Sequence, residues 1–163
     1  KPASQGSSLG VKVVTRVEDI PDALITALSY DSRALLETWV SGRELAVSVL
    51  GDRALPVVEA IPTDNNAYDF EARYEIGGAS FECPAALEDA QTEEVSRVAL
   101  AAYVALGCSG FARVDLILGE DGPMILEINA IPGLTETSLL PQAAEAGGIS
   151  FEEMVEQILD LAC

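Results

Sequence analysis

Two β-strands and a connecting turn are evident in GFARVDLILGEDGPMILEIN, residues 110–129. The Gly-Glu-Asp-Gly-Pro run between them is typical of a hairpin turn. Because side chains alternate between the two faces of a strand, Arg113 and Asp115 lie on one face of the first strand. Glu127 and Asn129 likewise share one face of the second strand. We therefore predict a hairpin in which Asp115 pairs with Glu127 and Arg113 with Asn129.

This pairing would bring two carboxylates and an amide oxygen together. Paired Cβ atoms lie about 4.5–5.5 Å apart, and like charges at that distance destabilise a sheet unless a cation compensates them. Mg²⁺ prefers such oxygen ligands and takes its others from water and phosphates. We therefore predict that Asp115, Glu127 and Asn129 hold a metal ion. Strict alternation also predicts the faces of the remaining residues of this strand: Ile125 beside Glu127, and Met124, Leu126 and Ile128 on the other side.

The composition restricts the classes of function. The 163 residues are 49% hydrophobic, carry a formal net charge of −18 and include no histidine. Such a chain can form one domain or two small lobes, but it lacks the basic surface that nucleic acids require, and binding to anionic membranes is disfavoured. Three scattered cysteines argue against zinc and fit a reducing, cytoplasmic environment. No signal peptide or membrane span is apparent, and because the chain opens on Lys1 we expect an N-terminal part to be missing.

Hydrophobic periodicity predicts an α+β chain built from antiparallel hairpins rather than an alternating βαβ fold. The expected helices are residues 18–30, with Asp19 as the cap, 92–106, 138–146 and 151–162, the last with a capping box of Ser150 and Glu153. The expected strands, besides the hairpin, are residues 11–15, 34–40, 44–50 and 54–61, the last two joined at Gly51-Asp52. Residues 62–78 lack periodicity and are expected to form a long loop.

Other candidate groups have plain structural explanations. The QGSSLG loop at residues 5–10 could wrap phosphates with backbone N–H groups, but it is not a Walker A loop, and taken alone it is better explained as a flexible surface turn. Glu37 and Glu44 fit solvated acids. Ser138 has no histidine to activate it, which excludes a Ser-His-Asp hydrolase. A pair of acids acting on glycosides would leave Asn129 and the Gly/Ser loop unexplained.

Six segments of the chain form an ordered set. They are Lys1-Pro2 through GSSLGV, ETWVSGRE (37–44), YDFEARY (68–74), CPA (83–85), GCSGFARVDLIL (107–118) and LEINAIPGLTETSLLP (126–141). Together they resemble the ATP-grasp family, and within it the D-alanine:D-alanine ligases. The resemblance implies an antiparallel or mixed sheet flanked by helices. Residues 1–40 would be part of the central subdomain and residues 41–163 the C-terminal subdomain, without the family's N-terminal domain.

The resemblance also implies roles for individual residues. Contacts to ATP would come from Lys1, Ser4, Gly6, Ser8 and Arg73 at the phosphates and from Glu37, Val40 and Glu44 at the adenine and ribose. Asp115, Glu127 and Asn129 match Mg²⁺ (or Mn²⁺) ligands, and Arg113 and the backbone at Gly133 match groups that stabilise an oxyanion. Ser138 and Leu139 match the region that holds the second D-alanine, and Ser7 and Tyr74 match a pair that closes the active site.

The implied reaction joins two D-alanines through an acylphosphate, for peptidoglycan and hence cell-wall synthesis. The expected partners are ATP and D-alanine, the full-length protein is expected to be a homodimer, and the fragment alone is expected to have little or no activity. Two positions depart from the family: Arg73 and Thr38 stand where lysine is common. Two alternatives stay open, a ligase that accepts D-lactate or D-serine and a non-catalytic module that binds ATP and Mg²⁺. Tyr74 favours the dipeptide ligase.

Overall fold

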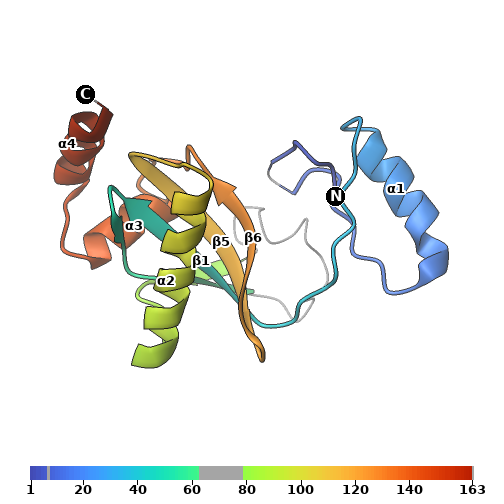
Figure 1. Cartoon of the computed structure of the whole chain (residues 1–163), viewed down its shortest axis with the longest axis horizontal. Helices are drawn as coiled ribbons and strands as arrows, with labels where there is room; N and C mark the ends of the chain where they lie inside the picture. Colours follow the sequence, from blue (N-terminus) through green and yellow to red (C-terminus); the bar gives the residue numbers. More distant parts are fainter. Residues whose placement is uncertain (7, 63–78, 163) are drawn as a thin grey trace. The chain divides into compact units, whose positions relative to one another are not determined.

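The computed structural model describes residues 1–6, 8–62 and 79–162 of the chain (Figure 1). Contacts divide the chain into two compact units, Lys1–Trp39 with Pro62–Ser80 and Val40–Ile61 with Phe81–Cys163. The elements in chain order are η1 (Val17–Asp19, a 3₁₀ helix), α1 (Ile20–Leu28), β1 (Arg43–Leu50), β2 (Arg53–Ala54), β3 (Val58–Pro62), β4 (Ala79–Glu82), α2 (Asp89–Ala105), β5 (Phe111–Gly119), β6 (Gly122–Asn129), α3 (Leu139–Ala146) and α4 (Phe151–Ala162).

The sheet has the strand order β4-β3-β1-β5-β6, and β2 pairs with β1 beside this path. β1 runs antiparallel to β2, β3 and β5, and β5 runs antiparallel to β6. The pairing of β1 with β5 covers the whole of β1, from Arg43 opposite Leu118 to Leu50 opposite Phe111. The predicted α+β class, an antiparallel sheet flanked by helices, is confirmed.

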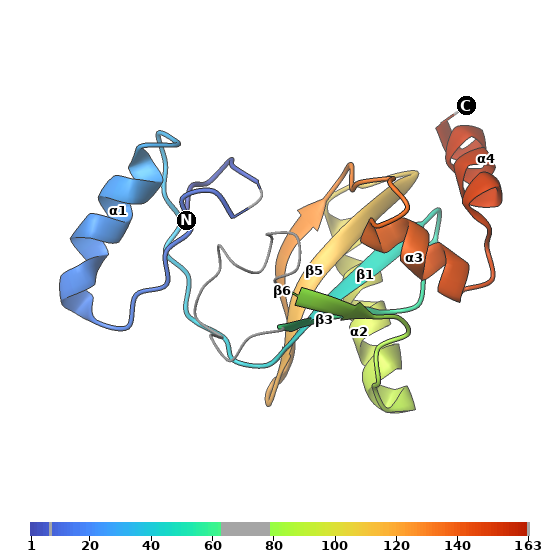
Figure 2. The same ribbon diagram turned by 180° about the vertical axis from the view of Figure 1, so that it is seen from behind.

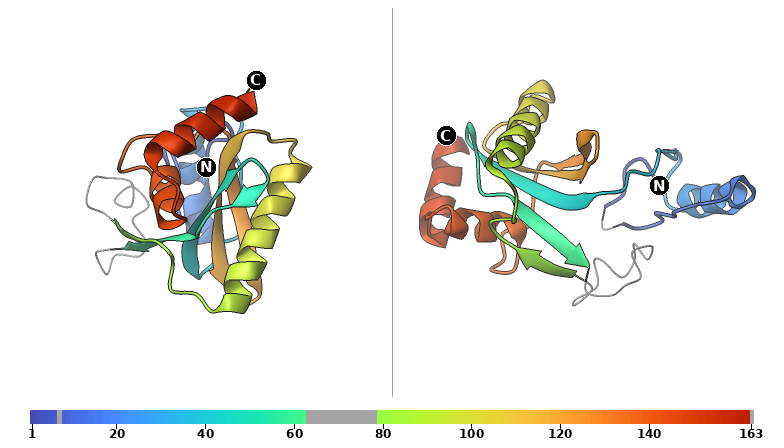
Figure 3. Two further views of the ribbon diagram at one scale, coloured as in Figure 1. Left: turned by 90° about the vertical axis from the view of Figure 1, so that its left-hand side faces the viewer. Right: turned by 90° about the horizontal axis from the view of Figure 1, so that it is seen from below.

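One face of the sheet is covered by α2. The side chains of Val95 and Ala99 are fully buried and pack against Leu45 and Val47 of β1 and Val114 of β5. Figure 3 shows this helix along one side of the strands, with α3 and α4 on the other side. The apolar residues of α2 therefore lie on one side of the helix and cover the face of β1 that its odd-numbered residues form.

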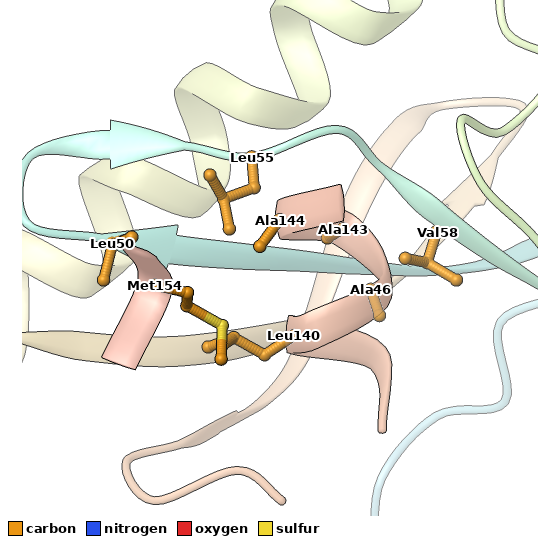
Figure 4. Packing of buried hydrophobic residues seen from close by; sticks show 8 residues of the cluster. All are labelled: Ala46, Leu50, Leu55, Val58, Leu140, Ala143, Ala144 and Met154. Carbon is orange, nitrogen blue, oxygen red and sulfur yellow. The ribbon is translucent and has the colours of Figure 1, made fainter. Parts of the chain in front are cut away.

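The opposite face of β1 is covered by α3 and α4. Leu140 of α3 and Met154 of α4 are fully buried against Ala46 and Leu50 of β1, together with Val58 of β3 (Figure 4). Figure 2 shows α3 lying close to β1 and β3. Residues 45–50 of β1 are buried on both faces, which explains why this strand is a nearly continuous apolar run rather than an alternating one.

The capping box predicted for α4 is confirmed. The backbone N–H of Ser150 donates to Oε2 of Glu153 at 2.9 Å, and the backbone N–H of Glu153 donates to Oγ of Ser150 at 3.2 Å. The hydrogen bond from the Ser150 backbone lowers the pKa of the Glu153 carboxyl. Replacing Ser150 with Ala is expected to lower the free energy of unfolding by about 1 kcal/mol. Urea unfolding followed by circular dichroism measures this, with Ser109→Ala as a control outside the helices.

The strand predictions for the first unit were wrong. Residues 11–15 form no strand, and of residues 34–40 only Ala34 pairs, in a single antiparallel bridge to Pro2. β-branched residues favour a strand only where a neighbouring strand offers hydrogen bonds, and within the described residues these segments have no such ladder. The predicted strand 54–61 is interrupted at residues 55–57, where Pro56 has no N–H to donate, and it becomes β2 and β3.

Several boundaries also differ from the predictions. The first helix is shorter than 18–30, and Asp19 stands at its N-cap but makes no side-chain cap hydrogen bond. α2 starts at Asp89 rather than residue 92, because Glu88 and Gln91 form a capping box with Glu in the place usually taken by Ser or Thr. The predicted loop at 62–78 lies outside the described residues apart from Pro62, which ends β3. None of the described helices is long and apolar enough to cross a membrane.

Candidate functional site

The hairpin of β5 and β6 has the predicted register around its polar residues. Asp115 lies directly opposite Glu127, and Arg113 lies directly opposite Asn129. Glu127 is exposed, and the other three residues are partly buried. Two carboxylates and an amide therefore occupy neighbouring positions on one face of the sheet, because paired residues share a face.

The alternation breaks beside this group. The register shifts next to Asp115, so that Leu116 faces Ile125 and Ile117 faces Met124, with Leu126 as the extra residue. Paired residues share a face, so Met124 lies on the Asp115 side and Ile125 on the Leu116 side. The predicted faces of Ile125 and Met124 were therefore wrong. A β-bulge explains the difference, since one extra residue reverses the alternation beyond it.

Arg113 provides a counter-charge for the first carboxylate. Its Nε donates to Oδ1 of Asp115 at 2.6 Å, and its Nη2 donates to Oδ2 at 2.7 Å. The Arg113 side chain is 16% exposed and that of Asp115 14%, so the pair is shielded from solvent. From the sequence, a metal ion was expected to compensate this charge. In the structure the planar guanidinium takes this role for Asp115 by a two-point contact.

The donor set fits a hard divalent cation. Asp115, Glu127 and Asn129 offer carboxylate and amide oxygens, which Mg²⁺ prefers over nitrogen or sulfur ligands. Among the described residues no group of three His, Cys, Asp or Glu side chains could hold a metal by itself. The three side chains would thus leave several positions of an octahedral ion to water and phosphate oxygens, which is how Mg²⁺ is usually bound with nucleotides.

Two residues expected near the nucleotide lie close to the hairpin. Glu44 of β1 is opposite Ile117 of β5, so Glu44 and Asp115 lie on the same face of the sheet. Val40 precedes β1 and lies next to Gly119, the last residue of β5. A Cβ placed on Gly119 would lie 3.5 Å from Cγ1 of Val40. The structure therefore gathers the predicted metal ligands and two predicted adenine or ribose contacts within one unit.

The loop after β6 brings two predicted substrate contacts together. A Cβ placed on Gly133 would lie only 2.6 Å from Oγ of Ser138, so the Gly133 backbone directly approaches the Ser138 hydroxyl. Ser138 is the N-cap residue of α3, yet its side chain makes no cap hydrogen bond. Leu139 packs against the core cluster that contains Leu140 and Met154. Packing of α3 on the sheet thus fixes where Ser138 lies.

The first unit holds the remaining described candidates. Nζ of Lys1 lies 2.9 Å from Oε2 of Glu37, so the residue expected at the phosphates and a residue expected at the adenine form an ion pair. The backbone N–H of Ser4 donates to Oδ2 of Asp31 at 2.6 Å. This loop is therefore held by Asp31, a contact that sequence reasoning missed.

The rest of the loop turns tightly. The carbonyl of Gly6 accepts from the N–H of Leu9 at 3.1 Å, and the carbonyl of Ser8 accepts from the N–H of Val11 at 3.1 Å. Ser8 has a φ of 56°, a left-handed conformation that is uncommon for a residue other than glycine. Three further candidates, Ser7, Arg73 and Tyr74, lie outside the described residues.

Sequence reasoning missed an ion pair at the start of β1. Nε of Arg43 donates to Oε1 of Glu59 at 2.7 Å, and a second guanidinium N–H donates to Oε2. This hydrogen bonding raises the pKa of the Arg43 guanidinium. Glu59 belongs to β3 and is only 9% exposed. The pairing of β1 with β3 brings the two charges together, so a motif search along one strand could not find them.

The profile of the family described as "D-ala D-ala ligase C-terminus" matches residues 1–160. The chain belongs to this family. Among curated relatives named D-alanine--D-alanine ligase, that of Pseudoalteromonas translucida is 44% identical over 161 residues, which cover 98% of this chain and 52% of the relative. That of Methylacidiphilum infernorum is 44% identical over 163 residues, covering 99% and 54%. The chain spans about half the length of the curated relatives that it matches.

Solved structures of the D-alanine--D-alanine ligase family share the fold. The enzyme of Bacillus anthracis superposes with a TM-score of 0.84 at 34% identity, covering 99% of this chain and 53% of that one. A structure of the Bacillus anthracis ligase complexed with ATP gives a TM-score of 0.83 at 30% identity, covering 99% and 50%. The family's fold thus extends over both compact units of this chain.

Proposed function

We propose that this chain is part of an ATP-dependent ligase that joins two D-alanines through an acylphosphate. The observation that carries the proposal is the polar face of the hairpin, where Asp115 pairs with Glu127 and Arg113 with Asn129. Membership of the D-alanine--D-alanine ligase family supports D-alanine as the substrate of this site. The ATP complex of the Bacillus anthracis ligase supports a nucleotide as the second substrate class.

The hairpin would act on the nucleotide phosphates. We assign Asp115, Glu127 and Asn129 as ligands for Mg²⁺ (or Mn²⁺), which would neutralise phosphate charge during transfer. Glu44 and Val40 would contact the ribose and adenine, since Glu44 lies on the Asp115 face of the sheet. In the first unit, we assign Lys1, Glu37, Ser4, Gly6 and Ser8 to ATP contacts, together with Arg73.

The loop from Gly133 to Leu139 would act on the acceptor amino acid. The Gly133 backbone N–H and the Arg113 guanidinium would stabilise negative charge on the carbonyl oxygen when the acceptor amine attacks it. Ser138 and Leu139 would hold the acceptor, supported by the packing of Leu139 on the core. Ser7 and Tyr74 are proposed to complete the site, and excluding water there would protect the acylphosphate from hydrolysis.

Further parts of the proposal concern the whole protein. Residues 1–40 would belong to the central subdomain of the ligase and residues 41–163 to its C-terminal subdomain. The full-length protein would be a homodimer in the cytoplasm that supplies a peptidoglycan precursor.

The decisive experiment uses the full-length protein that carries this chain. Incubated with ATP, Mg²⁺ and D-alanine, it is expected to release one ADP for each D-alanyl-D-alanine that mass spectrometry detects. Offering D-lactate or D-serine as the acceptor at pH 6 and pH 8 tests the related specificities. A preference for either acceptor would correct the substrate, and ATP binding without turnover would instead support a non-catalytic module.

A further inference from the structure

Three hydroxyl groups meet at the start of α3. Oγ1 of Thr135 lies 2.8 Å from Oγ of Ser138 and 3.3 Å from Oγ1 of Thr137. The backbone N–H of Thr135 also donates to Oγ of Ser138 at 3.2 Å, and the N–H of Ser138 donates to the Thr135 carbonyl at 2.8 Å. Ser138 is therefore bound to Thr135 by backbone and side chain together.

This arrangement is unusual for a serine at a helix N-cap. An N-cap serine normally accepts a hydrogen bond from a backbone N–H in the first turn of its helix. Ser138 makes no such bond, because its hydroxyl turns back toward Thr135. The turn is further held by Gln142, whose Nε2 donates to the Thr137 carbonyl at 2.9 Å. The hydroxyl of Ser138 is thus committed to a network outside its own helix.

The number of hydrogen bonds that a hydroxyl can make limits the further contacts of Ser138. A hydroxyl has one donor and two acceptor lone pairs. Ser138 accepts one bond from the Thr135 N–H. If the Thr135 O–H donates the second, with Thr137 donating in turn to Thr135, both lone pairs of Ser138 are filled. Its own proton is then free to donate, and each bond in such a chain polarises the next.

We propose that Thr135 is a positioning residue that, with Thr137, orients the Ser138 hydroxyl as a hydrogen-bond donor to the carboxylate of the acceptor amino acid. The inference rests on the proposed ligase function. It extends that function by assigning Thr135 and Thr137 to the positioning of the Ser138 hydroxyl. The close approach of Gly133 to Ser138 Oγ places this donor beside the proposed oxyanion contact.

The test compares Thr135→Val with Thr135→Ser in the full-length protein. Valine keeps the shape of threonine without the hydroxyl, so the Michaelis constant for the acceptor D-alanine is expected to rise about tenfold, the effect of losing an oriented hydrogen bond to a charged group. Serine keeps the hydroxyl and should restore the wild-type value. The Michaelis constants for ATP and the first D-alanine should stay within twofold in both variants.

A neutral acceptor separates positioning from general disruption. With D-alanine amide, which lacks the acceptor carboxylate, wild type and Thr135→Val should differ by less than twofold. The matched control is Thr92→Val in α2, which removes a hydroxyl that donates to the Glu88 carbonyl at 3.2 Å and should change neither constant. Thr137→Val, at an exposed position, should raise the Michaelis constant for the acceptor two- to threefold. This variant replaces Thr135→Val in the test if a thermal melt shows that Thr135→Val folds poorly.

Three other results would overturn the inference, and one of them would also refute the proposed function. An acceptor constant within twofold of wild type in folded Thr135→Val and Thr137→Val would overturn the inference while leaving the ligase function in place. An equal loss with D-alanine and its amide would show a merely structural role and also overturn it. A wild-type protein that forms no dipeptide would refute the proposed function, and this inference with it.

Discussion

Asp115→Asn is expected to lower the Mg²⁺-dependent ligase rate of the full-length protein roughly 100- to 1,000-fold, which corresponds to several kcal/mol of lost charge stabilisation. The amide keeps the shape of the side chain, and it can still accept one hydrogen bond from Arg113. It no longer offers a charged ligand opposite Glu127. The defect should appear in metal binding as well as in rate, so Mn²⁺ binding in the presence of ATP, followed by electron paramagnetic resonance, should weaken in parallel.

Asp121→Asn is the matched control for this change. Asp121 is an exposed residue in the turn of the same hairpin, so the variant alters net charge equally but leaves the paired carboxylates intact. Its rate and Mn²⁺ binding should stay near those of wild type. Unchanged Mg²⁺-dependent nucleotide binding in Asp115→Asn would show that the metal ligands were assigned wrongly. Equal losses in both variants would indicate a general effect of charge.

The pairing at the centre of the site could be predicted because the polar residues alternate along each strand, and Asp115 is indeed opposite Glu127. The turn alone would not give this register, because counting from Gly119 opposite Gly122 without a bulge would place Asp115 opposite Leu126. The faces of Met124 and Ile125 could not be predicted in the same way. A bulge adds one residue without a distinctive sequence signal, and it reverses every face beyond it.

The charge of Asp115 illustrates a second limit. Facing carboxylates were expected to need a cation, and a metal ion was the predicted one. Arg113 was already assigned to the same face, two residues earlier on the same strand, and in the structure it binds both oxygens of Asp115. Alternation alone therefore placed Arg113 near Asp115 and could have predicted the ion pair. The pair was not predicted because the resemblance had assigned Arg113 to the oxyanion instead. A metal ion at Asp115 would have to share these oxygens with the guanidinium or displace it.

Contacts between segments far apart in the chain were the least predictable. The ion pair of Arg43 with Glu59 depends on the register of β1 and β3, and the bond from Ser4 to Asp31 depends on how the first unit folds. Residues 11–15 have the composition of a strand, yet they form none. Strand formation requires a partner as well as propensity, and a single sequence does not state which segments meet.

Leu140→Ala is expected to lower the free energy of unfolding by about 3 kcal/mol, within the range of roughly 2–5 kcal/mol measured for buried leucines. Leu140 is fully buried between α3 and the sheet, in the cluster with Ala46, Leu50 and Met154 (Figure 4). The cost combines lost apolar burial with a cavity that neighbouring backbone can fill only partly. Urea unfolding of the full chain, monitored by circular dichroism, measures the change.

Leu159→Ala in α4 provides the comparison, because its side chain is 60% exposed and should cost less than about 1 kcal/mol. The packing also links stability to the proposed site. Leu140 follows Ser138 and Leu139 directly, so a loosened α3 should raise the acceptor Michaelis constant at temperatures well below unfolding, whereas Leu159→Ala should leave it unchanged. Equal stability losses in the two variants would contradict the assignment of α3 as the element that holds the acceptor loop on the core.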